Sequence, residues 1–244
     1  MGDVFILSRA AIFSPTRDFF RGVMLASKKV STEFLAHVEI ISLLRASESA
    51  IATAFACRQL KTLNLTCYYH FTAIPERLGD CAALTTLILQ VCHSLTTLPG
   101  RLGDCVSLTK LDMTDCSSLA ALPDRLGDCR VLTTLDLQVC HFLTTLPERL
   151  GDCVSLTKLD LTDCSALTAL PERLGDCTAL TKLDLMYCES LIALPERLGD
   201  CAALTTLKLR WSVRLTALPE RLGDCAALTK LNLTHCCNFP SHLR

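Results

Sequence analysis

Residues 90–116 read QVCHSLTTLPGRLGDCVSLTKLDMTDC, and residues 138–164 read QVCHFLTTLPERLGDCVSLTKLDLTDC. The two stretches start 48 residues apart, and a proline marks a 24-residue unit throughout this region, at Pro75, Pro99, Pro123, Pro147, Pro171, Pro195 and Pro219. No insertion or deletion interrupts this spacing. Because one short unit cannot bury its own apolar face, the repeat predicts stacked coils that share a continuous core.

Each unit predicts a short strand followed by a helical turn. In the run Leu87-Ile88-Leu89-Gln90, leucine stands at every second position, which is the period of a strand with one buried face. Proline then fixes the backbone at the start of Pro99-Gly100-Arg101-Leu102-Gly103, and the final glycine suits the close of a turn. We therefore expect an α/β repeat of about eight 24-residue coils, with parallel strands on the concave face and short helical turns on the convex face.

Residues 1–50 do not share the repeat. Ser31 suits a helix cap, and apolar residues follow it at helical spacing, at Phe34, Leu35, Val38, Ile41 and Leu44. The sequence thus predicts a helix near residues 32–46 that covers the first coil. The expected organisation is a poorly specified tail at 1–30, a helical N-terminal cap at 31–50, the repeat array at 51–239 and a C-terminal tail at 240–244.

Charge and hydropathy exclude several classes of partner. Lys and Arg total 24 against 25 for Asp and Glu, so neither nucleic acid nor an anionic membrane surface is expected to bind. No stretch approaches 18 consecutive apolar residues, and Arg9 interrupts the only run that resembles a signal peptide. Three arginines among apolar residues near the N-terminus weakly resemble a targeting segment, but Asp3 and Asp18 favour a tail. A cytoplasmic location is expected.

Most of the sixteen cysteines fall in two ladders that follow the repeat. One ladder comprises Cys57, Cys81, Cys105, Cys129, Cys153, Cys177, Cys201 and Cys225, and the other Cys92, Cys116, Cys140, Cys164, Cys188 and Cys236. Free cysteine behaves as a small buried apolar residue, and stacked side chains point in parallel instead of toward each other. The ladders therefore predict reduced, buried thiols in a reducing compartment.

No catalytic, cofactor or metal site is predicted. The sequence lacks CxxC, and His93 and His141 are two coils apart, about 10 Å, which is too far for one zinc ion. Residues 235–242 hold two histidines and two cysteines, which we interpret as an ordinary end of the array, with a metal site in a folded C-terminal tail as the alternative. Rows of Arg, Asp and Glu on the helical turns suggest a solvated face without a catalytic cleft.

The pattern LxxLxLxxCxxLxxLP resembles the leucine-rich repeat family over residues 51–239. Its cysteine, where asparagine is commoner, and its proline-containing outer segment are similar to the repeats of plant intracellular disease-resistance receptors of the nucleotide-binding type. The resemblance implies a recognition scaffold, in defence or signalling, and not an enzyme. Those receptors also carry a nucleotide-binding module, but no GxxxxGK followed by Ser or Thr occurs here, so no nucleotide cofactor is expected.

The units differ from one another most in the last three coils, where the candidate site lies. Tyrosine, tryptophan and arginine dominate the hot spots of protein interfaces, and Trp211 is the only tryptophan of the chain. The expected partner-binding residues are Met186, Tyr187, Lys208, Arg210, Trp211, Arg214, Lys230 and His235. The alternative for these residues is neutral variation on a free surface.

Two hypotheses of function follow from the sequence. In the first, the chain is a monomeric, non-catalytic module that binds a protein through its concave face. In the second, it is a fragment or a regulatory subunit of an intracellular receptor whose nucleotide-binding or ligase part is absent from this chain. An open reading frame upstream that encodes a phosphate-binding loop would favour the second hypothesis.

Overall fold

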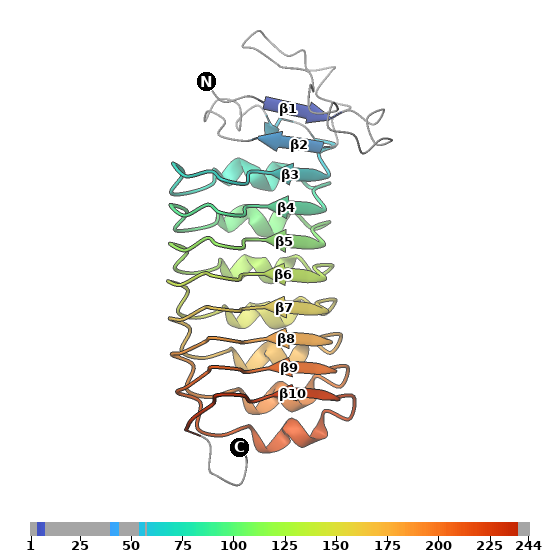
Figure 1. The fold of residues 1–244 in the computed structure, drawn as a ribbon. Coiled ribbons are helices and arrows are strands. Elements are labelled where there is room, and N and C mark those ends of the chain that lie inside the picture. Colours follow the sequence, from blue (N-terminus) through green and yellow to red (C-terminus); the bar gives the residue numbers. More distant parts are fainter. Residues whose placement is uncertain (1–3, 8–39, 44–53, 57, 239–244) are drawn as a thin grey trace, which may run out of the picture.

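The computed structural model describes residues 4–7, 40–43, 54–56 and 58–238, and in this part of the chain ten strands form one sheet in sequence order (Figure 1). Neighbouring strands are parallel from β2 onward, whereas β1 is antiparallel to β2. The strands are β1 Val4–Leu7, β2 Ile40–Leu43, β3 Thr62–Asn64, β4 Thr86–Ile88, β5 Lys110–Asp112, β6 Thr134–Asp136, β7 Lys158–Asp160, β8 Lys182–Asp184, β9 Thr206–Lys208 and β10 Lys230–Asn232.

The register between strands equals the sequence repeat. From β3 to β10, each residue pairs with the residue 24 positions further on, as Leu111 does with Leu135 and Leu135 with Leu159. The leucine at the centre of each strand therefore stacks in one column, and these leucines have no solvent exposure from β3 to β9. The stacked coils thus share the continuous core that the repeat predicts.

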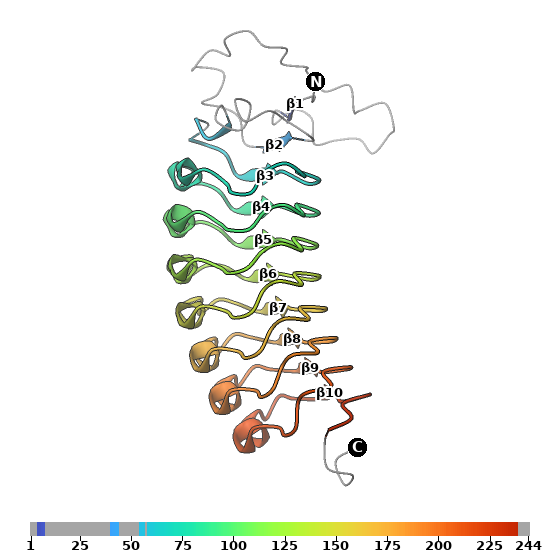
Figure 2. The same ribbon diagram turned by 90° about the vertical axis from the view of Figure 1, so that its left-hand side faces the viewer.

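Short 3₁₀ helices cover the opposite side of the coils, where Figure 2 shows them in a single column. Each begins directly after the repeat proline, whose φ lies between −59° and −70° and so suits the entry to a helical turn. The helices are η3 Glu76–Asp80, η4 Gly100–Asp104, η5 Asp124–Asp128, η6 Glu148–Asp152, η7 Glu172–Asp176, η8 Glu196–Asp200 and η9 Glu220–Asp224. The expected short helical turns are confirmed.

The glycine of each helical turn has a role other than the predicted one. It lies inside the helix instead of closing it, and no glycine in the described part of the chain has a positive φ. A Cβ atom on Gly103 would lie 2.3 Å from the carbonyl oxygen of Arg125 in the next coil. The residue is glycine because the coils approach too closely there for any side chain.

The prediction of a helix near residues 32–46 is wrong at residues 40–43, which are the part of this range that the structure describes. These residues form β2, which pairs in parallel with β3 and extends the sheet by one strand. β-Branched residues such as Ile40 and Ile41 favour strands, and the edge of β3 offers unpaired backbone groups to a neighbouring strand. The rest of the predicted cap and most of the predicted tail lie outside the described residues, although β1 falls within that tail.

Both cysteine ladders bond to the preceding coil. The Cys116 thiol donates a hydrogen bond to the Leu89 carbonyl over 3.1 Å, and the Cys105 thiol donates to the Leu78 carbonyl over 3.4 Å. Burial raises the pKa of the Cys105 thiol to about 12, so the thiol stays protonated and able to donate. The thirteen described ladder cysteines are buried, as the sequence predicts, and their reduced state stays a prediction; Cys57 lies outside the described residues.

Arginines and aspartates on the helical column form a continuous chain of ion pairs. The Arg173 guanidinium contacts Asp152 of the preceding coil at 2.6 Å and Asp176 of its own helix at 3.0 Å. The same arrangement recurs from Arg101 to Arg221. Hydrogen bonds from two such arginines hold the pKa of Asp104 below its usual range. Because each of these arginines is paired within the column, they are not free cations for an acidic partner.

Candidate protein-binding face

The concave face is formed by the side chains that alternate with the buried leucines of each strand. In the first of three rows, threonine and lysine alternate along most of the sheet, from Thr62 to Lys230. The central row carries Asn64, Ile88, Asp112, Asp136, Asp160, Asp184, Lys208 and Asn232. The third row follows the strand ends and includes Gln138, Met186 and Arg210. These rows lie side by side because the strand register is constant.

The central aspartates have a structural role that the sequence reasoning missed. The carboxylate of Asp160 accepts a hydrogen bond from the backbone N–H of Thr162 at 3.2 Å, and Asp184 accepts one from Met186 at 3.2 Å. Asn64 and Asn232 make the same bond, so this row turns the chain at the end of the strand. The signal in the sequence is Asp or Asn at one fixed position in six units.

Lysines neutralise most of these carboxylates. The Lys158 ammonium lies 3.3 Å from Asp136 and 3.1 Å from Asp160, and Lys110 lies 3.2 Å from Asp112. The four aspartate side chains are only 7–12% exposed. The acidic row is therefore covered by its own partners, and its carboxylates are not available to a ligand.

In every described coil, the residue directly after the third-row residue in the sequence has a left-handed backbone conformation. Its φ lies between 60° and 65°, and the sequence gives Cys67, Val91, Asp115, Val139, Asp163, Tyr187, Trp211 and His235 at this position. Such a φ costs a residue other than glycine on the order of 1 kcal/mol, and aspartate tolerates it better than bulky residues do. Backbone hydrogen bonds hold the position, such as that from the Tyr187 N–H to the Arg210 carbonyl at 2.8 Å.

Three successive left-handed positions at the C-terminal end carry aromatic rings, which stack. The centroids of Trp211 and His235 are 4.2 Å apart with the rings 20° from parallel. Those of Tyr187 and Trp211 are 6.4 Å apart with an angle of 11°. The stack is partly exposed, with Tyr187 at 37%, so it forms an aromatic surface along the edge of the concave face. We call Tyr187, Trp211 and His235 the aromatic stack.

The structure brings together part of the predicted site. The aromatic stack lies beside the exposed Arg210, and Met186 precedes Tyr187 on the same edge and is half-buried. Lys208 differs from the others, because its ammonium is bound to Asp184 at 2.6 Å. Arg214 and Lys230 are exposed, at the turn after the stack and on the edge strand β10 respectively. That these residues bind a partner stays a prediction.

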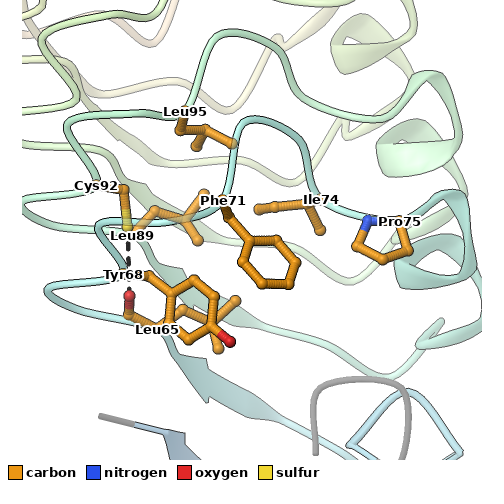
Figure 3. A pocket seen from close by; sticks show the side chains of 8 residues that line it. All are labelled: Leu65, Tyr68, Phe71, Ile74, Pro75, Leu89, Cys92 and Leu95. Atoms are coloured by element: carbon orange, nitrogen blue, oxygen red, sulfur yellow. Dashed lines mark hydrogen bonds between the residues drawn. The ribbon is translucent and has the colours of Figure 1, made fainter. Parts of the chain in front are cut away.

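One small apolar pocket lies in the first repeat coil, where Tyr68 stands in place of the ladder cysteine (Figure 3). The rings of Tyr68 and Phe71 pack edge to face with centroids 4.4 Å apart, and the Cys92 thiol bonds to the Leu65 carbonyl beside them. The pocket is partly open, and the space it leaves for the centre of a water-sized sphere is about 10 Å³, which is room for one water molecule at most. It is therefore too small to be a ligand site.

Two kinds of site are not found in the described part of the chain. No group of three or more His, Cys, Asp or Glu side chains is placed there to hold a metal ion. Within the same residues, no helix has the length and apolar character needed to cross a membrane.

Comparison with solved structures identifies the fold. A leucine-rich repeat protein of Leptospira interrogans superposes with a TM-score of 0.68 and 24% identity, over 88% of this chain and 55% of that one. The chain folds as a leucine-rich repeat solenoid. It spans about half the length of the Leptospira protein. No protein-family model and no curated protein matches the chain.

Two further structures share the leucine-rich repeat solenoid at lower identity. Internalin C2 of Listeria monocytogenes has a TM-score of 0.55 and 14% identity, over 83% of this chain and 84% of that one. Toll of Drosophila, in its complex with Spätzle, has a TM-score of 0.61 and 20% identity, over 86% of this chain and 28% of that one. At these identities the similarity establishes the fold alone.

Proposed function

We propose that the protein is a non-catalytic recognition scaffold that binds a protein partner through the concave face of the coils of β8, β9 and β10. The observation that carries the proposal is the aromatic stack. Bulky aromatic side chains occupy this left-handed backbone position in three successive coils, whereas the earlier described coils have Cys, Val or Asp there. The left-handed position recurs in every described coil, so the change of its side chain to an aromatic ring, and not the backbone conformation, distinguishes this end of the face.

The fold supports the same function. Leucine-rich repeat structures generally serve protein–protein recognition, and the solved neighbours include Toll in complex with Spätzle. A partly exposed tryptophan flanked by arginine is also the side-chain combination that dominates interface hot spots. The buried thiols of the ladders favour a reducing compartment, and we propose a cytoplasmic, monomeric protein that acts in signalling or defence.

The double variant Arg210→Ala/Trp211→Ala tests this function. We expect that at least thirtyfold more of this variant than of the wild type is needed to capture the same amount of partner from a lysate of the source organism. The reason is that a hot-spot residue contributes about 2 kcal/mol or more. Its melting temperature should stay close to that of the wild type, because Arg210 is exposed and Trp211 only half-buried.

The matched control is Arg130→Ala/Val131→Ala, which removes an exposed cation and an exposed apolar side chain beside η5 instead of beside the stack. This control should capture the partner as the wild type does. Undiminished capture by Arg210→Ala/Trp211→Ala, or equal loss by the control, would contradict the proposed site.

A further inference from the structure

Charge is distributed unequally along the concave face. In the coils of β5, β6 and β7, the strand and the three residues after it carry five carboxylates and two lysines, a net charge of −3. The corresponding residues of β8, β9 and β10 carry four cations and one carboxylate, a net charge of +3. The change of sign coincides with the start of the aromatic stack.

In the central row, β9 carries Lys208 where β5 to β8 carry aspartate, and this difference leaves Lys182 of β8 without an ion pair to the residues that the structure describes. In β5 and β7 the lysine that opens the strand pairs with the aspartate two residues later. In β8 the aspartate is Asp184, but Lys208 of the next coil holds it at 2.6 Å. Lys182 therefore has no ion pair within the described residues, although its strand carries the same Lys-Leu-Asp sequence.

On the concave face, β9 and β10 and the residues directly after them contain no carboxylate that could pair with Arg210 or Lys230. Lys230 opens β10, but the central position of that strand is the neutral Asn232. Arg210 occupies the third row, and neither it nor Lys230 forms an ion pair in the part of the chain that the structure describes. Lys182 and Lys230 lie in one row, separated by Thr206, so their strands are about 10 Å apart.

From this arrangement we infer that the surface binds an acidic peptide segment, whose carboxylates lie against Lys182, Arg210 and Lys230 while an aromatic or apolar side chain packs on the aromatic stack. This inference rests on the proposed function and adds the chemistry of the partner to it. Unpaired, exposed cations attract a segment of opposite charge and orient it. Met186 next to the stack supplies an adaptable apolar contact. A basic segment would be repelled by the net charge of +3.

The test uses three fluorescein-labelled octapeptides, of alternating Glu and Tyr, Gln and Tyr, and Lys and Tyr, with the full chain titrated and anisotropy measured. The Glu–Tyr peptide should bind at least tenfold more tightly than the other two, and its affinity should fall as sodium chloride is raised. Equal binding of the three peptides, or preference for the Lys–Tyr peptide, would overturn the inference. Tighter binding of a thymidine oligonucleotide of the same length would also overturn it, in favour of a nucleic acid.

The charge-reversal variant Lys182→Glu/Lys230→Glu assigns the binding to this surface. It should weaken the Glu–Tyr complex about tenfold or more. The matched control Arg58→Glu/Arg130→Glu makes the same change in net charge at exposed cations elsewhere on the array, and it should weaken the complex less than twofold. An equal effect of the two variants would contradict the assignment. If the inference fails here while Arg210→Ala/Trp211→Ala still abolishes partner capture, the acidic chemistry is wrong and the proposed function stands.

Discussion

The substitution Gly151→Ala is expected to lower the free energy of unfolding by about 3 kcal/mol, which is the upper range for overpacking in a protein interior. A Cβ atom on Gly151 would lie 2.2 Å from the carbonyl oxygen of Arg173 and 2.9 Å from its carbonyl carbon. These are backbone atoms of the next coil, so no side-chain rotation relieves the contact. The coils of η6 and η7 must separate, which would also disturb the ion pair from Arg173 to Asp152. Urea denaturation followed by circular dichroism measures the change.

The same substitution at Gly223 provides the control. Gly223 has the same place in the repeat, in η9, but no atom lies within 4 Å of its Cβ position because no described coil follows. Alanine also restricts the unfolded chain, so Gly223→Ala should leave the stability unchanged or raise it by up to about 1 kcal/mol. If both substitutions destabilised the protein equally, the close approach between coils would not be the reason for the glycine.

Truncation of a central core leucine is expected to have a comparable effect. Leu159 lies in the middle of β7, has no solvent exposure and stacks between Leu135 and Leu183. Leu159→Ala should lower the free energy of unfolding by about 3 kcal/mol, because it removes buried apolar surface and leaves a cavity between coils held by neighbours on both sides. The midpoint of urea denaturation should fall, while the far-ultraviolet spectrum of the folded protein stays the same.

Leu231 is the equivalent residue of β10 and tests whether the end of the array differs from its middle. Its side chain is 41% exposed, and β10 has a strand neighbour on only one side within the described residues. We expect Leu231→Ala to cost less than about 1 kcal/mol, since partly exposed side chains lose little burial. A loss as large as that of Leu159→Ala would show that β10 is covered, and would contradict its description as the edge of the sheet.

The repeat alone predicted the fold, because each local signal has the same consequence in every unit. Leu87 and its equivalents specify a strand, Pro99 and its equivalents specify the start of a helical turn, and the constant 24-residue spacing then requires parallel stacking in register. The residues outside the repeat were less predictable. Ile41 fits a helical pattern as well as a strand pattern, and pairing with β3, which is a tertiary effect, decided between them.

The candidate site was predictable in its position but not in its chemistry. The exceptions to the repeat identified Trp211 and its neighbours, and the structure adds that Tyr187, Trp211 and His235 stack. Which cations are paired depends on side-chain geometry across coils, so the sequence could not show that Lys208 is neutralised by Asp184. For the same reason Lys182 was not among the predicted residues.

The most direct test of the recognition surface is amide hydrogen exchange of the full chain, free and bound to the partner that it captures. Binding through the proposed face should slow exchange at residues 182–187, 206–211 and 230–235, with little change at the helices η3 to η9. Protection confined to those helices, or to the coils of β3, β4 and β5, would contradict the account.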